Sequence, residues 1–148
     1  MDSRAIGDEL IRRFEGCRLD AYPDPATGGP PWTIGWGSTG PDVGPGARWT
    51  QAEADARLAE EIARLAAAID EMALGPLSEH QKGALISFAY NVGETALARS
   101  SLARLIREGR FADAAGEFLR WNRAGGRVLP GLVHRRRAER AMFMTSDA

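Results

Sequence analysis

The sequence is poor in cysteine and histidine, which limits the covalent and metal chemistry available to it. Cys17 is its only cysteine, so no disulfide can form within the chain, and a cysteine-based metal site is not expected. His80 and His134 have no second ligand at metal-binding spacing, so we expect no metal site at either histidine. A reducing compartment fits this cysteine usage.

Long apolar stretches are also missing. The chain has no apolar run of the roughly 18 residues that mark a membrane-spanning helix. Its first residues, MDSRAIGDELIRRFEG, have neither the apolar region nor the small-residue cleavage site of a signal peptide. We therefore expect a protein made in the cytoplasm that does not insert stably into a membrane. With 148 residues, 44% of them hydrophobic, the chain is long enough for one globular unit with a real core.

The net charge of −1 hides an asymmetry between the two halves of the chain. Residues 1–75 contain 13 acidic and 7 basic residues, a net charge of −6, whereas residues 76–148 contain 7 acidic and 12 basic residues, a net charge of +5. A basic C-terminal half favours an anionic polymer as partner. A solvated, arginine-rich helix face explains the same pattern without any partner.

The first part of the chain combines a short helix with a β-rich segment. Apolar residues recur at helical spacing over residues 3–14. From residue 18 to 39 the period changes to two, and Trp32, Ile34 and Trp36 alternate with small residues. One strand face is therefore bulky and apolar, while the other is nearly bare and open to a ligand. The segment between the expected strands, PDPATGGPP, is rich in turn-forming residues.

The rest of the chain is predicted to be helical. Capping-box sequences occur at residues 50–53 and 78–81, and the first opens a periodic stretch of more than 20 residues. Further helices are expected at residues 101–108, 111–121 and 132–144. Because the β segment is confined to one region, the sequence favours an α+β fold over an alternating parallel-sheet fold. Five aromatic residues recur at helical spacing and are expected in the core: Phe88, Phe111, Phe118, Trp121 and Phe143.

Two acids and a threonine lie around the turn-rich segment. Hydrolysis of a glycosidic bond requires a protonated acid at the leaving oxygen and a second group that handles water. Glu15, at a helix C-terminus and partly buried, should favour its protonated form, whereas Asp24, in a polar turn, should stay ionised. Thr33 lies on the bare strand face, where its hydroxyl could hold a water molecule. The structural alternatives are a helix-end carboxylate paired with an arginine, a turn cap and an ordinary strand threonine.

The order of these residues resembles the phage-type lysozymes (endolysins, glycoside hydrolase family 24). That family has a Glu, an Asp and a Thr in a pattern like FEG.RL.AY.D……WTIG.G.T, and this sequence has FEGCRLDAYPD followed by WTIGWGST. The segment LSEHQKGALISFAYNVGETALARSSLARLIREGRFADAAGEFLRW is similar to the family's helical lobe, and GLVHRRRAERAMF is similar to its ending. The likeness covers about residues 8–143 in the same order.

The resemblance implies a muramidase that needs no cofactor and cleaves the β-1,4 bond between N-acetylmuramic acid and N-acetylglucosamine in peptidoglycan. It makes Glu15 the general acid, with Asp24 and Thr33 positioning and activating the attacking water. The family's sugar-contacting positions correspond in this chain to Thr39, Tyr90, Ser101 and Glu117.

The resemblance also predicts the organisation and partners of the chain. It implies one lysozyme-like domain over residues 1–148, with a β-rich active-site lobe at about 15–50 and a connecting helix at about 51–74. A helical lobe would follow at about 75–148, with the helix at 1–14 packed on it. The expected protein is a monomer that binds peptidoglycan glycan strands, whose anionic peptide stems suit the basic half. It would be made in the host cytoplasm and lyse the cell wall after the membrane is permeabilised.

Two features depart from the family pattern. The turn from Asp24 to Thr33 has eight intervening residues and is longer than the pattern, so ATGGPP resembles an insertion. Ser38 replaces a histidine that is common in the family. One alternative is therefore a catalytically impaired peptidoglycan-binding module on the same fold. Another, nucleic-acid binding through the arginine-rich last helix, lacks a recognisable binding motif.

Overall fold

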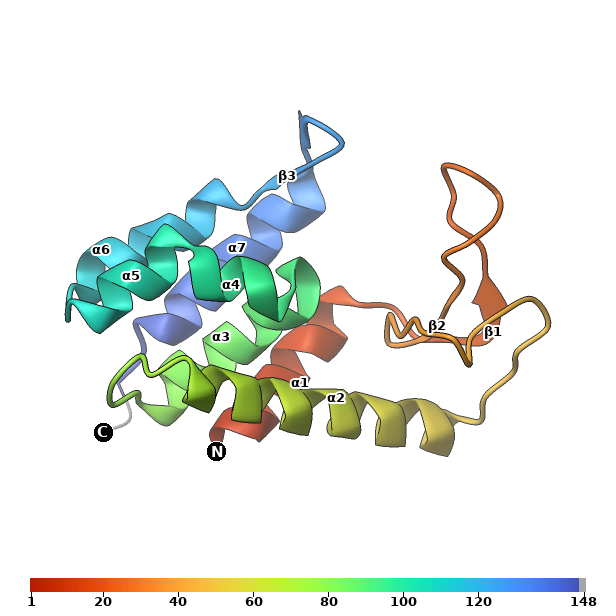
Figure 1. The fold of residues 1–148 in the computed structure, drawn as a ribbon, viewed down its shortest axis with the longest axis horizontal. Coiled ribbons are helices and arrows are strands. Elements are labelled where there is room, and N and C mark those ends of the chain that lie inside the picture. The colour runs from red at the N-terminus through yellow and green to blue at the C-terminus, as the bar shows by residue number, and fades with distance from the viewer. Residues whose placement is uncertain (147–148) are drawn as a thin grey trace. The chain divides into compact units, whose positions relative to one another are not determined.

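The computed structural model describes residues 1–146 and divides them into two compact units (Figure 1). One unit comprises Ile11–Glu61, and the other comprises Met1–Leu10 together with the chain from Ile62 onward. Both boundaries fall inside helices, in α1 (Ser3–Phe14) and in α2 (Gln51–Glu71). The α+β prediction is confirmed, because two small sheets accompany a mainly helical chain.

A short antiparallel hairpin forms the centre of the unit at residues 11–61. Strand β1 (Arg18–Tyr22) pairs with β2 (Thr33–Gly35). The register partners are Arg18 with Gly35 and Tyr22 with Thr33, and the register changes between these pairs because β1 has more residues than β2. The segment at residues 47–49 also pairs with β1, through hydrogen bonds from Ala21 to Ala47 and from Trp49 to Leu19. No strand was predicted at residues 47–49.

The capping box predicted at residues 50–53 is confirmed and begins α2. The Glu53 amide donates to the Thr50 hydroxyl at 3.1 Å, and the Thr50 amide donates to the Glu53 carboxylate at 3.2 Å. These two bonds satisfy amide groups that a helix start would otherwise leave without partners. The helix ends before Ala73, which adopts a left-handed backbone with φ of 53°.

The second unit contains the remaining helices and a small hairpin. Its elements are α3 (Glu79–Val92), α4 (Glu94–Arg99), α5 (Ser101–Arg107), α6 (Phe111–Glu117), η1 (Phe118–Arg120), β3 (Arg123–Ala124), β4 (Arg127–Val128) and α7 (Pro130–Phe143). Helix α3 packs against α7, and α5 packs against α6. Ser78 and Gln81 form the second predicted capping box at the start of α3. Neither α4 nor the β3–β4 hairpin was predicted from the sequence.

An aromatic cluster fills the core of this unit. The Phe88 and Phe118 rings meet edge to face with centroids 5.4 Å apart, and Phe118 and Phe143 are 5.3 Å apart. The core prediction is confirmed for these three buried residues, whereas Phe111 and Trp121 are half-buried at its margin. Such pairs add stability beyond the apolar area that they bury.

Two glycines allow α1 and α3 to approach closely. A Cβ atom on Gly83 would lie 2.4 Å from Cγ2 of Ile6, and one on Gly7 would lie 2.6 Å from Cγ2 of Ile86. Real carbon atoms do not approach so closely, so each glycine is required by the packing of the opposite isoleucine.

Candidate active site

Glu15 follows directly after the last residue of α1. Its amide donates to the Ile11 carbonyl at 2.8 Å, which continues the helical hydrogen-bond pattern by one residue. The residue is half-buried, as the sequence analysis expected. The helix therefore fixes the position from which the Glu15 side chain leaves the backbone.

Asp24 closes the turn between β1 and β2 with both its backbone and its side chain. Its amide donates to the Gly29 carbonyl at 2.9 Å, and its carbonyl accepts from the Gly28 amide at 2.8 Å. Its carboxylate accepts from the Ala26 amide at 2.8 Å, an Asx-turn contact. The five residues after Asp24, at positions 25–29, are therefore folded into a compact loop of their own.

This closed loop explains how the longer turn is accommodated. Tyr22 is the register partner of Thr33, and Asp24 comes two residues after Tyr22. Residues in register in an antiparallel pair are about 5 Å apart, and two strand residues span about 7 Å. Asp24 and Thr33 therefore belong to the same end of the hairpin, while the extra residues fold beyond the Asp24–Gly29 hydrogen bond.

The expectation of a bare strand face is wrong at Gly35. This glycine is buried, and a Cβ atom on it would lie 3.0 Å from Cζ3 of Trp49. Its φ of +66° also departs from strand geometry. Gly35 thus makes room for an indole ring from the segment after the hairpin, so no sugar can approach the backbone there.

Thr39 lies in the loop after β2, and α2 anchors that loop. Arg57 donates from Nη2 to the Thr39 carbonyl at 2.9 Å and from Nη1 to the Asp42 carboxylate at 2.8 Å. The hydrogen bond from Arg57 lowers the pKa of Asp42, and the carboxylate in turn raises the pKa of Arg57. Arg57 was not among the predicted site residues, because opposite charges fifteen positions apart carry no local signal.

The other three substrate-contact candidates belong to the second unit. Tyr90 is half-buried near the end of α3, and Ser101 is the exposed first residue of α5. Glu117 ends α6 and pairs with Arg120 at 3.5 Å. Of the four substrate-contact candidates, only Thr39 lies in the same unit as the three catalytic candidates.

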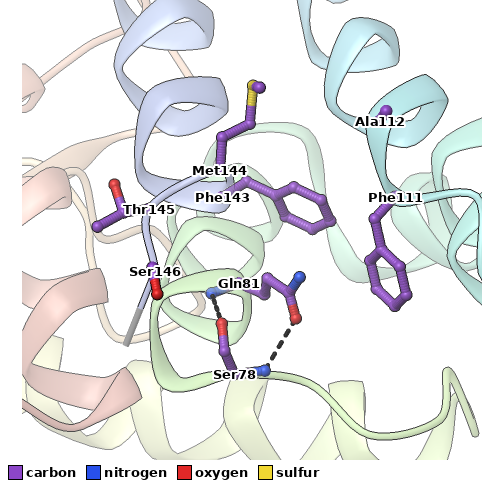
Figure 2. Close-up of a pocket in the computed structure, with 8 residues that line it drawn as sticks. All are labelled: Ser78, Gln81, Phe111, Ala112, Phe143, Met144, Thr145 and Ser146. Carbon is purple, nitrogen blue, oxygen red and sulfur yellow. Dashed lines mark hydrogen bonds between the residues drawn. The ribbon is translucent and has the colours of Figure 1, made fainter. Parts of the chain in front are cut away.

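A hollow of about 500 Å³ lies between the start of α3 and the end of α7 (Figure 2). Phe111, Phe143 and Met144 provide its apolar surface. Two of its polar residues, Ser78 and Gln81, are engaged with each other's backbone in the capping box drawn as dashed lines. None of its described lining residues is acidic, so this hollow offers no group for acid catalysis.

Residues 1–146 contain neither a cluster of metal ligands nor a membrane-spanning helix. That part of the chain has no group of three His, Cys, Asp or Glu side chains placed to hold a metal ion. None of its helices is long and apolar enough to cross a membrane.

Comparisons with known proteins identify relatives along most of the chain. The phage lysozyme family model matches residues 12–139. An endolysin of Bacillus phage B103 is 38% identical over 148 residues, which are 100% of this chain and 56% of the relative. An endolysin of Acyrthosiphon pisum secondary endosymbiont phage 1 is 39% identical over 138 residues, covering 90% of this chain and 92% of the relative.

A solved structure also matches this chain over almost its whole length. The muramidase domain of SpmX from Asticaccaulis excentricus matches with a TM-score of 0.84 and 36% identity, and covers 95% of both chains. The chain spans about half the length of the two Bacillus phage endolysins that it matches.

Proposed function

The chain belongs to the phage lysozyme family, and we propose that it is a muramidase acting on peptidoglycan. Its reaction is hydrolysis of the β-1,4 bond between N-acetylmuramic acid and N-acetylglucosamine, which lyses the bacterial cell wall. The reaction uses side chains of the protein alone and no cofactor. The protein acts as a monomer at the cell wall.

One observation carries this proposal. Asp24 and Thr33 share one end of the hairpin despite the longer turn, because Tyr22 is in register with Thr33 and the extra residues close on Asp24. An acid from a helix end and a second acid from the hairpin that follows it supply the two carboxyl groups that glycoside hydrolysis needs.

The proposed chemistry assigns one role to each residue. Glu15 gives its proton to the glycosidic oxygen as the bond from that oxygen to the anomeric carbon breaks. A water molecule held by Asp24 and Thr33 forms the new bond to the anomeric carbon, and its proton passes to Asp24. Because water enters from the face opposite to the leaving group, the product has inverted configuration.

The substrate contacts follow from the family assignment. Thr39, Tyr90, Ser101 and Glu117 contact sugar residues of the glycan strand. The basic residues of the C-terminal half attract the anionic peptide stems, an effect that salt should weaken.

Replacement of the proposed acid tests the assignment. Glu15→Gln keeps the size of the side chain but cannot give up a proton, so release of reducing sugars from purified sacculi should fall by at least about 100-fold. Glu9→Gln is the matched control, because Glu9 is an exposed acid of α1, the helix that Glu15 directly follows. Full activity in folded Glu15→Gln would refute the role of Glu15.

A binding module without catalysis is the alternative on the same fold, and the longer turn is the feature that favours it. Such a module would sediment with insoluble cell wall and release no reducing sugars. Wild-type protein should instead release them, and Glu15→Gln should still sediment with the wall.

A further inference from the structure

The carboxylate of Asp55 lies at the centre of a hydrogen-bonded junction in the unit at residues 11–61. Its Oδ1 accepts from Nε1 of Trp36 at 2.9 Å and from Nε2 of Gln51 at 2.9 Å. The same oxygen accepts from Nη1 of Arg12 at 3.3 Å. We call these four residues the Asp55 junction. The three catalytic candidates belong to the same unit.

The Asp55 junction holds the chain on both sides of Glu15. Arg12, three positions earlier, belongs to the last turn of α1, and the Glu15 amide is bonded to the Ile11 carbonyl in that turn. Cys17, two positions after Glu15, accepts at its sulfur from Nε2 of Gln51 at 3.6 Å. The backbone that carries the Glu15 side chain is therefore attached to α2 at two points.

The junction also reaches the strand that begins with Thr33. Ile34, the next residue, exchanges two backbone hydrogen bonds with Ser38, at 2.9 and 2.8 Å, and these bonds close a tight turn around Trp36. From that turn the indole N–H reaches the central carboxylate, and the Arg12 guanidinium lies 4.9 Å from the centroid of the indole ring. One oxygen thus connects the end of α1 with β2.

We propose that Asp55 is a positioning residue of the muramidase reaction, which sets the place of Glu15 relative to Thr33 without touching the substrate. The inference rests on the proposed function and adds a residue to it. Catalytic groups act only when they are held in the right geometry, and a misplacement of about 1 Å can cost about 100-fold in rate. A junction that attaches both supports to one oxygen provides that geometry.

An ordinary surface ion pair does not account for these contacts. The pair between Arg12 and Asp55 is partly exposed on both sides, and such a pair by itself contributes little. The junction differs because its donors come from three elements, namely α1, the turn after β2 and α2. Loss of the carboxylate takes the shared acceptor from all three at once, so their effects should not be additive.

Removal of the carboxylate tests the role. Asp55→Ala should lower kcat on peptide-free glycan strands about 10- to 100-fold with little change in KM, because a misplaced catalytic group slows the chemical step rather than binding. Ser78→Ala is the matched control for lost stability. It removes the capping hydrogen bond from the Gln81 amide, in the other unit, and should keep wild-type kcat. Both variants are assayed well below their melting temperatures.

A double-mutant cycle tests whether the contacts act through the shared oxygen. Trp36→Phe removes the indole N–H and keeps an aromatic ring beside Arg12. It should lower kcat by less than Asp55→Ala does, and the double variant should be no slower than Asp55→Ala alone. Losses that multiply in the double variant would overturn the shared junction.

Amide hydrogen exchange provides a measurement that does not depend on activity. The Glu15 amide should exchange about tenfold faster in Asp55→Ala than in wild type or Ser78→Ala, because the end of α1 loses its anchor. An unchanged exchange rate at Glu15, or wild-type kcat in folded Asp55→Ala, overturns the positioning role. Failure of the wild-type protein to release reducing sugars would instead refute the proposed function, and the exchange rates would still decide whether the junction holds Glu15.

Discussion

The indole of Trp36 donates to Oδ1 of Asp55 at 2.9 Å. The same oxygen accepts from the Gln51 amide group at 2.9 Å and from the Arg12 guanidinium at 3.3 Å. Arg12 also lies over the Trp36 ring, 4.9 Å from its centroid. One carboxylate oxygen therefore joins the residues before the hairpin, the segment after β2 and the first turn of α2.

This junction predicts that stability depends on pH in the acid range. The hydrogen bonds from Trp36 and then Gln51 lower the pKa of Asp55, so its contribution is present above the unfolded pKa of about 3.9 and is lost as pH falls through the folded-state pKa. Asp55→Asn should have a lower melting temperature than wild type at pH 7. The difference in melting temperature between the two proteins should become smaller below about pH 4. Thermal melts at several pH values check this. A difference that is constant with pH would contradict it.

Because α1 packs closely on α3, one methyl group added at Gly83 should clearly lower the stability of the protein. Gly83→Ala would place a carbon 2.4 Å from the Ile6 side chain, and such overpacking costs about 1–3 kcal/mol. Gly116→Ala is the control, because a Cβ on Gly116 in α6 meets nothing within 4 Å, and alanine should stabilise a helix by about 0.5–1 kcal/mol there. Urea unfolding measures both changes. Equal stability of the two variants would contradict the predicted contact.

A buried ionic cluster predicts another large loss of stability. Glu139 is fully buried and meets Arg135 at 3.2 Å, Arg136 at 2.7 Å and the Ser87 hydroxyl at 2.6 Å. Glu139→Ala leaves two buried guanidinium groups without their carboxylate, which should cost about 3–5 kcal/mol.

A solvent-exposed ion pair between a glutamate and an arginine provides the control for Glu139→Ala. Glu108 pairs with Arg104 at 2.9 Å across one helical turn, with 42% of the glutamate side chain exposed. Glu108→Ala should cost less than about 1 kcal/mol, because solvent screens exposed pairs. Urea unfolding of both variants would refute the prediction if their losses were alike.

Much of the fold could be predicted from local patterns. Helix α2 has a capping box at its start and a long apolar period, so its type and start followed from the sequence. Helix α4 has only six residues between Gly93 and Ser100, too few for a period to emerge. The pairing of Trp49 with Leu19 joins segments thirty residues apart, and no local pattern encodes such a partner.

Local sequence patterns also predict only part of the candidate site. The order of Glu15, Asp24 and Thr33 is visible in the sequence, and so is the length of the turn between the last two. That Asp24 closes this turn on Gly29 depends on backbone conformation, which the sequence constrains only by its content of glycine and proline. The burial of Gly35 under Trp49 depends on a distant segment, so the sequence predicted an open face there.

The Asx-turn at Asp24 makes it possible to separate a catalytic role from a structural one. Its carboxylate oxygen accepts from the Ala26 amide at 2.8 Å, and the amide oxygen of an asparagine can accept the same bond. If Asp24 only caps the turn, Asp24→Asn should retain activity and Asp24→Ala should lose stability and activity together. If Asp24 receives the proton of the attacking water, both variants should lose about 100- to 10,000-fold in kcat.

We expect the second outcome, with Asp24→Asn as stable as wild type. The informative measurement is therefore kcat on peptide-free glycan strands beside the melting temperature of each variant. Thr27→Ala is the matched control, because it removes a hydroxyl that accepts from the Gly29 amide at 3.2 Å inside the same loop and touches none of the proposed chemistry. Near wild-type kcat in Asp24→Asn would assign Asp24 to the turn and leave the water to another group.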